Sequence, residues 1–595
     1  MAHLADADRD AYLTTLAPGD DIDHRGTPFT EELLNDLLKP LRDPTTGHPL
    51  LGEAWFDGAQ FLGDARFERV QFSVPAGFGG AQFFGDASFI GTHFSGLARF
   101  HSAQFSRDAR FERVSFSGPA WFGGTQFSGD ATGFSGAQFS SEASFVGAQF
   151  SGAALFDRAQ FSRDARFERV SFSGPTGFHE AQFSGDARFE RVVFSGTVWF
   201  DLAQCSGNAS FDQAQFDGVP VVGPLACAGK VVLSGAVFKL PLTLEIAARA
   251  VVAERTRWES TATIRLRYAT VNLSHAVLSA PVAVSATATP LTTTYGVTLG
   301  ENLLPGSAGV RIASVQGVDA AYLVLTDTDL SDCLFSGAFH LDQLRLEGRA
   351  TFASAPAGWH RRRLWPARWT RRRTLAEEHH WRAQTAGQPV PPGPSGSPHQ
   401  WRPGPYHPDP ARTPDPDDVA ALYRQLRKAF EDGKNEPGAA DFYYGECEMR
   451  RHDRTGTPSG ERRLLWGYWL LSGYGLRASR AMGWLLTAMS LTVLLLMGFG
   501  LPTHDPDPAT TGTVHGSKIS LNTTTPDPAL HGDWHQRITW PRAEKAVRVA
   551  VNSVIFRSSG QNLTIPGTYI EMASRLLEPT LLALAALAVR GRIKR

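Results

Sequence analysis

The sequence predicts an all-β solenoid followed by an α-helical membrane region. Phe accounts for 39 of the 595 residues, against 11 Tyr and 14 Trp, and most of the Phe residues recur at a regular spacing in the first third of the chain. Small and turn-forming residues alternate with them, which is typical of short strands and excludes a helical repeat. An uncharged apolar run long enough to span a bilayer lies late in the chain, at 481–501.

The regular repeat begins at Phe56 and ends at Phe216. Gaps of five and six residues alternate, apart from one gap of seven between Phe127 and Phe134, and 29 of the 30 positions are Phe, with Cys205 the exception. The repeating unit is therefore eleven residues long. We expect these rings to form the structural core of the solenoid, with representative positions at Phe61, Phe67, Phe72, Phe78, Phe83, Phe89, Phe111, Phe167 and Phe189.

The residue two places before each Phe is usually small, as at Ala59 and Ala65. Residues i and i−2 point the same way only in extended chain, so each unit is predicted to be a brief strand with both side chains inward. Ser-Gly, Gly-Asp and Arg-Asp pairs between units suit tight turns. Four such sides would close one coil of 22 residues, and the coils would stack at the strand spacing of roughly 4.8 Å, with Phe on Phe.

This pattern resembles the pentapeptide-repeat family, and the resemblance implies a right-handed quadrilateral β-helix. The repeats here have a Phe centre at a 5+6 spacing, whereas the commoner form has Leu at strict fives. The commoner form occurs downstream, at Leu325–Phe335 and Val271–Leu278. We therefore predict a regular solenoid over 51–218 and an irregular continuation over 219–352.

The N-terminal segment 1–50 is predicted to cap the first coil, because a solenoid has open strand edges only at its two ends. Within this segment, Thr30–Leu41 is predicted to form a short amphipathic helix. Thr30 would be its N-cap, and acidic residues follow in the first turn.

The charge balance of the chain argues against nucleic-acid binding, because 58 Lys and Arg face 59 Asp and Glu. Some pentapeptide-repeat proteins mimic DNA and bind gyrase through an acidic face, and residues 51–220 carry 18 acidic residues against 12 Arg. The two signs alternate along the units, which favours rows of ion pairs on a solvated face over mimicry. The four cysteines form no closely spaced pair, which favours a reducing compartment.

Residues 353–416 are predicted to be a linker that is basic at first and then rich in Pro. The arginines of Arg361–Arg373 are interspersed with Trp, which suits contact with anionic lipid headgroups, and a solvated basic linker explains the pattern equally well. The Pro content of 383–417 cannot build a core and favours an extended spacer.

The rest of the chain is predicted to enter a membrane. Residues 417–480 would form a cytoplasmic helical hairpin and an interfacial helix, followed by transmembrane helices at 481–501 and 570–589. Arg residues precede the first span and basic residues follow the second, at 590–595, so both ends are predicted to be cytoplasmic and 502–569 to be outside. We therefore expect a multi-pass protein of the bacterial inner (plasma) membrane with a cytoplasmic solenoid.

The second span carries the one candidate site, a polar face made by Glu571, Arg575 and Glu578. The spacing i, i+4 and i+7 places them on one helix face, where they can pair, and ionisable residues within a span usually face protein or water. The alternative is that they lie among the headgroups and the helix is short. We find no catalytic motif, no cofactor-binding motif and no supported metal site in the sequence.

These features favour a membrane-anchored scaffold that binds a protein partner through its solenoid at the cytoplasmic face of the bilayer. A rigid rod with a repetitive surface suits multivalent contact. The alternative is a two-helix channel regulated by the solenoid, which would require a homo-oligomer, because an apolar helix and a Gly-containing loop lie between the spans. A membrane-associated oxidoreductase, a label that chains of this layout sometimes carry, comes third, since no residue pattern supports a cofactor site.

Overall fold

The computed structural model describes residues 5–218, 221–356, 358–362, 365–369, 371–387, 400–402, 414–555 and 561–593. The chain divides into two compact units. The first comprises Met1–Pro414 and Gln425–Lys434, and the second comprises Asp415–Arg424 and Asn435–Arg595.

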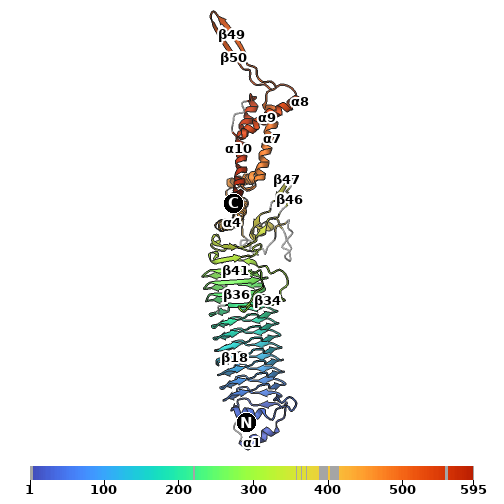
Figure 1. Cartoon of the computed structure of the whole chain (residues 1–595), viewed down its shortest axis with the longest axis vertical. Helices are drawn as coiled ribbons and strands as arrows, with labels where there is room; N and C mark the ends of the chain where they lie inside the picture. The colour runs from blue at the N-terminus through green and yellow to red at the C-terminus, as the bar shows by residue number, and fades with distance from the viewer. Residues whose placement is uncertain are drawn as a thin grey trace. The chain divides into compact units, whose positions relative to one another are not determined.

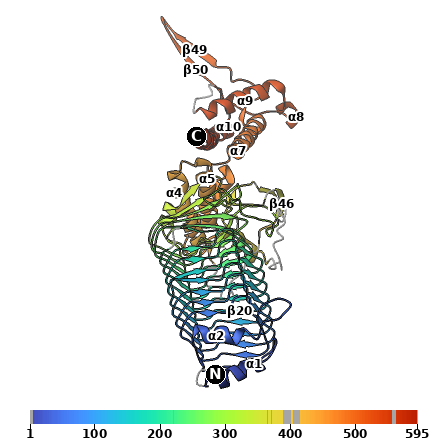
Figure 2. The ribbon, with the colours of Figure 1, turned by 60° about the horizontal axis from the view of Figure 1, so that its bottom comes forward.

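The first unit is a parallel-strand β-solenoid of about 13 turns, which confirms the predicted fold class (Figure 1). Each regular coil contributes four short strands, one to each of four faces, and pairs in parallel with the coils before and after it. Phe72 pairs with Phe94, so successive coils are 22 residues apart. Figure 2 shows these coils stacked one on another.

On faces 1 and 3, a strand typically begins with an inward Ala and continues with an outward residue, and the ladder Phe follows the strand. The strands of face 1 are β1 (Ile22–Asp23), β4 (Ala54–Trp55), β8 (Ala76–Gly77), β12 (Ala98–Arg99), β16 (Ala120–Trp121), β20 (Ala143–Ser144), β24 (Ala165–Arg166), β28 (Ala187–Arg188) and β32 (Ala209–Ser210). The strands of face 3 are β6 (Ala65–Arg66), β10 (Ala87–Ser88), β14 (Ala109–Arg110), β18 (Ala131–Gly133), β22 (Ala153–Leu155), β26 (Thr176–Gly177) and β30 (Val198–Trp199).

On faces 2 and 4, the strand itself ends on the ladder Phe, and the residue before it, often Gln, points outward. The strands of face 2 are β2 (Pro28–Phe29), β5 (Gln60–Phe61), β9 (Gln82–Phe83), β13 (Gln104–Phe105), β17 (Gln126–Phe127), β21 (Gln149–Phe150), β25 (Ser171–Phe172), β29 (Val193–Phe194) and β33 (Gln215–Phe216). The strands of face 4 are β3 (Leu50–Leu51), β7 (Gln71–Phe72), β11 (His93–Phe94), β15 (Ser115–Phe116), β19 (Gln138–Phe139), β23 (Gln160–Phe161), β27 (Gln182–Phe183) and β31 (Gln204–Cys205).

The predicted Phe ladder forms the core of these coils, and every representative position named from the sequence is at most 1 % exposed. Rings one coil apart stack face to face, as do Phe61 and Phe83 with centroids 4.6 Å apart and planes 7° apart. Neighbouring columns meet edge to face, which is the other favourable arrangement of aromatic rings. The seven-residue gap leaves the ladder unbroken, because Phe134 still stacks on both Phe111 and Phe156.

After residue 220 the coils become irregular, and long strands run through the corners that join one face to the next. Leu242 pairs with Ala262, so these coils are 20 residues apart. Residues 287–310 leave the solenoid and pack Leu291, Leu299 and Leu304 against its side. The elements are β34 (Val221–Val232), β35 (Val237–Phe238), β36 (Leu242–Val252), β37 (Arg257–Trp258), β38 (Ala262–Arg267), β39 (Thr270–Asn272), β40 (Val277–Leu278), β41 (Val282–Ala286), β42 (Arg311–Ser314), η1 (Ala320–Tyr322), β43 (Leu323–Thr326), η2 (Leu341–Gln343) and β44 (Arg345–Glu347).

Helices α1 (Asp6–Thr15) and α2 (Glu31–Leu38) lie at the N-terminal end of the solenoid (Figure 2). The hydroxyl of Thr30 accepts a hydrogen bond from the backbone N–H of Leu33 at 3.2 Å, which confirms the predicted N-cap. The helix ends at Leu38, earlier than predicted, and it buries Leu34, Leu37 and Leu38. The amphipathic pattern in the sequence therefore marks the face that packs.

At the other end of the solenoid, the structure corrects the expectation that 353–416 is only a linker. The described residues there form β45 (Ala353–Ser354), β46 (Gly358–Arg362), β47 (Trp365–Trp369), β48 (Arg373–Thr374) and α3 (Ala376–Thr385). Helix α3 is packed, and its charged residues Glu378 and Arg382 are buried and paired with each other. The composition alone does not reveal this pairing. Most of the Pro-rich part, 388–399 and 403–413, lies outside the described residues.

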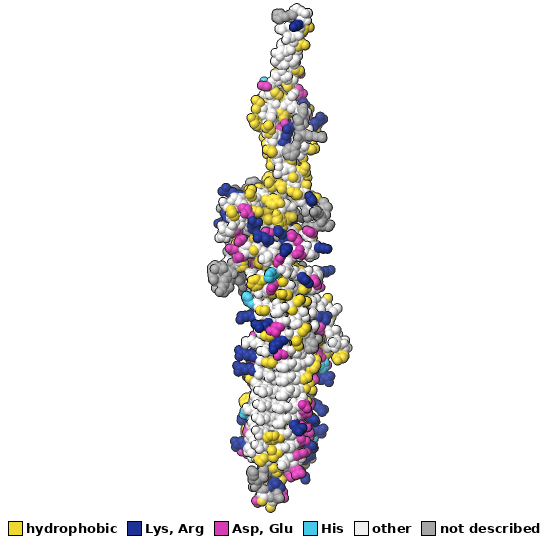
Figure 3. All heavy atoms as spheres, turned by 90° about the vertical axis from the view of Figure 1, so that its left-hand side faces the viewer, with side chains coloured by type: hydrophobic (Ala, Val, Ile, Leu, Met, Phe, Trp, Pro, Cys, Tyr) yellow, Lys and Arg dark blue, Asp and Glu magenta, His cyan; other side chains and the backbone are white. Residues whose placement is uncertain are grey.

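The second unit is helical, and Figure 3 shows hydrophobic side chains gathered over it. Its first helices form the predicted hairpin, and a strand hairpin separates the two long helices. The elements are α4 (Pro416–Asp432), which contributes residues to both units, α5 (Glu436–His452), α6 (Ser459–Ser472), α7 (Ala478–Leu495), the π-helix η4 (Leu496–Gly500), β49 (Ala509–His515), β50 (Lys518–Thr524), α8 (Trp534–Arg537), α9 (Trp540–Val554) and α10 (Ile565–Ile593).

Candidate functional site between the two apolar helices

Two helices of the second unit are long and apolar enough to cross a membrane, judged by length and composition. These candidate spans cover Ala478–Gly500, which is α7 with its π-helical extension, and Ile565–Arg590 within α10. They pack against each other, and α9 packs against both. The predicted ranges 481–501 and 570–589 lie within one residue of these limits or inside them.

The structure places the three predicted polar residues of α10 in two different environments. Glu571, which is buried, and Arg575, which is partly exposed, form an ion pair at 2.6 Å. Glu578 is fully buried and accepts a hydrogen bond from the hydroxyl of Thr492 on α7, with 2.9 Å between Oγ1 and Oε1. The spacing therefore predicted the Glu571–Arg575 pair correctly, whereas Glu578 binds the other span instead of Arg575.

The two spans meet at a pair of glycines. A Cβ atom on Gly567 would lie 2.3 Å from the carbonyl oxygen of Gly500, so only glycine allows this approach. Next to it, Thr564 donates a hydrogen bond from its backbone N–H to Gly500 and one from its hydroxyl to the carbonyl of Phe499, at 3.0 and 2.7 Å. The start of α10 is thus fixed to the end of the first span.

Arg542, from α9, binds the end of the same π-helix. Its guanidinium donates hydrogen bonds to the carbonyl oxygens of Met497, Leu501 and Pro502, at 3.1, 2.7 and 2.7 Å. The last carbonyls of a helix have no intrahelical hydrogen-bond donor. In a π-helix each carbonyl bonds five residues ahead instead of four, so the set of carbonyls left without a donor differs from that of an α-helix. Arg542 satisfies them and holds α9 against the junction of the two spans.

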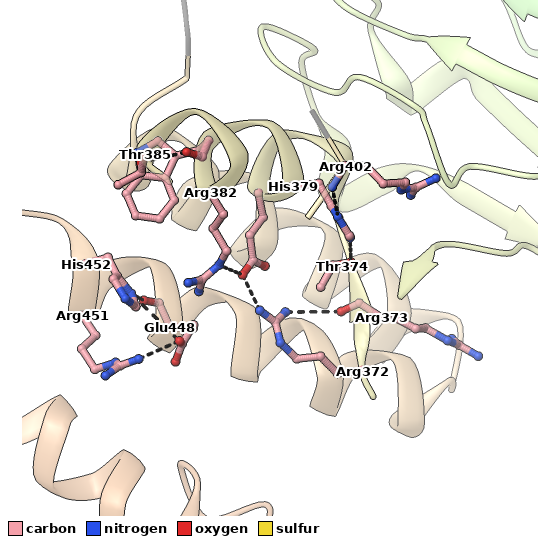
Figure 4. Close-up of polar contacts among 12 residues, drawn as sticks. Arg372, Arg373, Thr374, His379, Arg382, Thr385, Arg402, Glu448, Arg451 and His452 are labelled. Carbon is pink, nitrogen blue, oxygen red and sulfur yellow. Dashed lines mark hydrogen bonds and ion pairs between the residues drawn. The ribbon is translucent and has the colours of Figure 1, made fainter. Parts of the chain in front are cut away.

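At the C-terminal end of the solenoid, α3 holds a separate network of buried charges (Figure 4). Glu378 is fully buried and accepts hydrogen bonds from Arg372 at 2.5 Å and from Arg382 at 2.7 Å. Its neighbour Glu377 accepts hydrogen bonds from the backbone N–H groups of Phe335 and Ser336, and burial raises the pKa of Glu377 to about 6. Glu377 thus ties α3 to the last coil, and Glu378 ties it to Arg372 in the segment that precedes it.

His379 continues this network in neutral form. The backbone N–H of Arg402 donates to its Nδ1 at 3.2 Å, so Nε2 carries the proton and faces the hydroxyl of Thr374 at 2.8 Å (Figure 4). Burial, and then the positive charge of Arg402, lowers the pKa of His379 to about 3. The side chain therefore serves as an uncharged link between α3 and β48.

The predicted lipid contact at Arg361–Arg373 needs correction at Arg372. Arg372 is 6 % exposed and its guanidinium forms an ion pair with Glu378, so the side chain is not available to contact a lipid headgroup. The side chains of 358–369 lie outside the described residues, and the lipid contact stays a prediction for them.

A third network lies within the second unit, on α5, α6 and the turn after α6, and Figure 4 shows the part that lies on α5, with Glu448 and Arg451. Glu448 is buried and accepts hydrogen bonds from the hydroxyl of Tyr474 at 2.9 Å and from Arg451 at 2.7 Å. Arg451 lies over the ring of Trp469, 4.7 Å from its centroid. Burial, and then the carboxylate of Glu448, raises the pKa of Tyr474. These groups pair between α5, α6 and the turn after α6, which gives them a packing role.

Among the described residues, no group of three or more His, Cys, Asp or Glu side chains could hold a metal ion. A groove of about 970 Å³ lies beside α2 and the first coils. Its lining contains the basic residues Lys39, Arg42, Arg66 and Arg69 and the acidic residues Asp36 and Glu68, so it carries a small excess of positive charge.

Part of the chain matches a family model described as "Pentapeptide repeats (9 copies)". The matches cover residues 89–132, 111–160, 134–182, 156–204 and 167–215, all within the regular coils. These coils are pentapeptide repeats. The family match and the four-faced solenoid confirm the resemblance stated from the sequence, in its Phe-centred form. No curated protein and no solved structure matches the chain.

Outside the pentapeptide-repeat solenoid, sequence reasoning found Glu578 but missed the groups that surround it. Thr492 is one of two threonines in an apolar run, and nothing in the sequence distinguishes it from Thr487. Arg542 has no motif either. The glycines at 500 and 567 were the detectable signal, because glycines at the ends of apolar helices permit close backbone approach.

Proposed function

We propose that this protein is a membrane-anchored docking protein. In this proposal α7 and α10 hold the chain in the bacterial inner membrane, and the pentapeptide-repeat solenoid presents a protein-binding surface on the cytoplasmic side. The two candidate spans support the anchor. The basic residues around them support the orientation. Arg462, Arg463 and Arg477 precede α7, Arg480 lies in its first turn, and Arg590 and Arg592 lie at the end of α10.

The observation that carries the docking role is the repeated surface of face 2. Gln60, Gln82, Gln104, Gln126 and Gln149 occupy the same outward position in consecutive coils, in register. Coils at the strand spacing of roughly 4.8 Å place these side-chain amides in one uncharged row of donors and acceptors. A row of identical groups favours a partner that makes repeated contacts with an extended surface.

The test is capture of a partner by the full-length protein in mild detergent. Substituting Gln82, Gln104 and Gln126 by Lys puts like charges on the row without touching the core. We expect a partner captured by the native chain to be lost from this variant. Lys at Gln138, Gln160 and Gln182 is the matched control, because these exposed glutamines occupy the same outward position in consecutive coils of face 4. Equal capture by native chain and row variant would contradict docking on face 2.

The orientation is tested separately with a membrane-impermeant maleimide. The four native cysteines are buried, so an added cysteine reports its own side of the membrane. In spheroplasts we expect labelling of Thr513→Cys, in the exposed strand hairpin after the first span, and none of Ser128→Cys in the solenoid. The reverse pattern would place the solenoid outside.

A second candidate function, an oligomeric two-helix pore, has one supporting observation. Helix α9 lies in the chain between the two spans, buries Ala546, Val549 and Ala550, and leaves Val547 and Val551 exposed on its other side. A short amphipathic helix between two spans is the layout expected of a pore-forming subunit. Potassium flux through liposomes containing the full chain, together with cross-linked oligomers, would support the pore. Monomers without flux would contradict it.

A further inference from the structure

Glu578 is a carboxyl group enclosed between two apolar helices. It lies near the middle of α10, directly before Pro579, and its side chain has no exposed surface. The neighbouring inward positions Leu581 and Ala585 on α10, and Leu485 on α7, are apolar and buried. Thr492 supplies the single hydrogen bond found for it, and the second carboxyl oxygen, Oε2, has no partner among the described residues.

The charged groups on the same helix do not neutralise Glu578. Arg575, one turn earlier, is 2.6 Å from Glu571. On α7 the one charged residue is Arg480, in the first turn, where it donates a hydrogen bond to the carbonyl of Trp469 at 2.8 Å. The rest of α7 and its π-helical end, 481–500, contain no Asp, Glu, Lys or Arg. The nearest cations in sequence are therefore either engaged elsewhere or absent.

The other elements packed against α10 also leave Glu578 without a cation. On α9, Arg548 pairs with Glu544 at 2.6 Å and Lys545 pairs with Asp505 at 3.1 Å. Arg542 is bound to backbone carbonyls at the end of the π-helix. On α6, Glu461 binds Arg450, and Arg462 donates to the carbonyls of Asp453 and Thr457.

A carboxylate without a counter-charge is very unfavourable in such a place, whereas a neutral carboxylic acid needs only ordinary hydrogen bonds. The hydroxyl of Thr492 donates to Oε1, which suits the carbonyl-like oxygen of a neutral acid. Pro579 lacks an N–H, so the carbonyl of Arg575, one turn before Glu578, has no helical donor and provides a nearby acceptor. The three side-chain oxygens here, Oε1 and Oε2 of Glu578 and Oγ1 of Thr492, are too few for a cation such as Ca²⁺, which takes about six to eight oxygen ligands.

We propose that Glu578 is a proton-binding site between the two spans, with the proton on Oε2. Loss of the proton would leave an uncompensated charge between α7 and α10 and would weaken their contact. The inference rests on the packing of α7 against α10 alone, so it stands or falls independently of docking by the solenoid.

The first test is labelling by dicyclohexylcarbodiimide of the full chain in mild detergent. The carboxyl oxygen adds to the central carbon of the carbodiimide and its proton moves to a nitrogen. An acyl shift from oxygen to nitrogen then gives a stable acylurea, with no leaving group. We expect peptide mass spectrometry to find the adduct on Glu578 and none on the exposed Glu544, with labelling that declines as pH rises. Labelling of Glu544 equal to that of Glu578 would overturn the proposal.

The second test does not depend on access by the reagent. Unfolding of native chain and Glu578→Gln is compared in mixed micelles between pH 4 and pH 8. In the unfolded chain Glu578 ionises above about pH 4.3, whereas in the folded chain it keeps its proton to higher pH. Stability of the native chain should therefore fall relative to Glu578→Gln as pH rises, by up to tenfold in the unfolding equilibrium per pH unit.

Glu571→Gln is the matched control, because Glu571 lies on the same helix face but is paired with Arg575. Removing a carboxylate that has a counter-charge should reduce stability at neutral pH, whereas Glu578→Gln should raise it. The proposal would be overturned if the unfolding free energies of the native chain and Glu578→Gln differed by the same amount at every pH between 4 and 8, whether or not the carbodiimide labels Glu578.

Discussion

Two adjacent phenylalanines, Phe83 and Phe84, provide a direct test of the aromatic ladder. Phe83 ends strand β9, is fully buried and stacks on Phe61 and Phe105 with centroid distances of 4.6 and 4.5 Å. Phe84 follows it in the turn and is 46 % exposed. The two substitutions Phe83→Ala and Phe84→Ala therefore remove the same atoms, one residue apart, from the core and from the surface.

The expected effects differ by about 4 kcal/mol. Truncating a buried Phe to Ala costs about 3–5 kcal/mol, because the apolar contacts are lost and a cavity remains. Two stacked pairs at favourable distances place Phe83 within this range, since each such pair contributes about 0.5–1.5 kcal/mol beyond buried area. Phe84→Ala should change the stability by no more than about 0.5 kcal/mol. Because about 1.4 kcal/mol is a factor of ten, the core substitution should favour local opening by about a thousandfold.

Hydrogen exchange followed by mass spectrometry measures this opening coil by coil, which suits a repeat protein whose coils contact only their neighbours. We expect peptides that cover Phe61–Phe105 to exchange about a thousandfold faster in Phe83→Ala, with smaller changes in distant coils. The amide of Phe84, bonded to the carbonyl of Phe61 at 2.9 Å, should be among those affected. Equal acceleration in both variants, or none in Phe83→Ala, would refute a stacked-ring core.

Three further predictions concern the junctions. Gly567→Ala should lower the melting temperature in detergent, because its Cβ would lie 2.3 Å from Gly500, whereas Gly483→Ala in α7 meets nothing within 4 Å and should be neutral or stabilising. Arg542→Lys should speed hydrogen exchange in α9 by at least tenfold, because the guanidinium reaches the three carbonyls from two separate nitrogens in a rigid plane, whereas the donors of an ammonium group all lie on one atom; no change would show that these bonds do not hold α9. With its pKa lowered to about 3, His379 must stay neutral in the folded state, so α3 should lose stability relative to His379→Gln by about 1.4 kcal/mol per pH unit as pH falls below about 6.5. Exchange rates of α3 peptides that show no widening difference between pH 6.5 and pH 4.5 would argue against a buried neutral histidine.

Local patterns determined the solenoid, the N-terminal helix and the two long apolar helices. A Phe every five or six residues with a small residue two places earlier specifies strand, direction of side chains and coil length together, because in extended chain alternate residues share a face. The same rule tolerates the extra residue before Phe134, which still stacks on Phe111 and Phe156. Helix spacing likewise predicted the pair of Glu571 with Arg575.

Tertiary structure decided what the charged residues outside the repeats do. Arg372 and Arg382, part of an apparently basic linker, are buried around Glu378, because α3 folds back onto the end of the solenoid. Glu578 was identifiable as an ionisable residue in a span, but its neutral surroundings and its contact with Thr492 depend on how α10 meets α7. Contacts between residues 86 positions apart follow from the packing of whole helices, which periodicity within either helix does not encode.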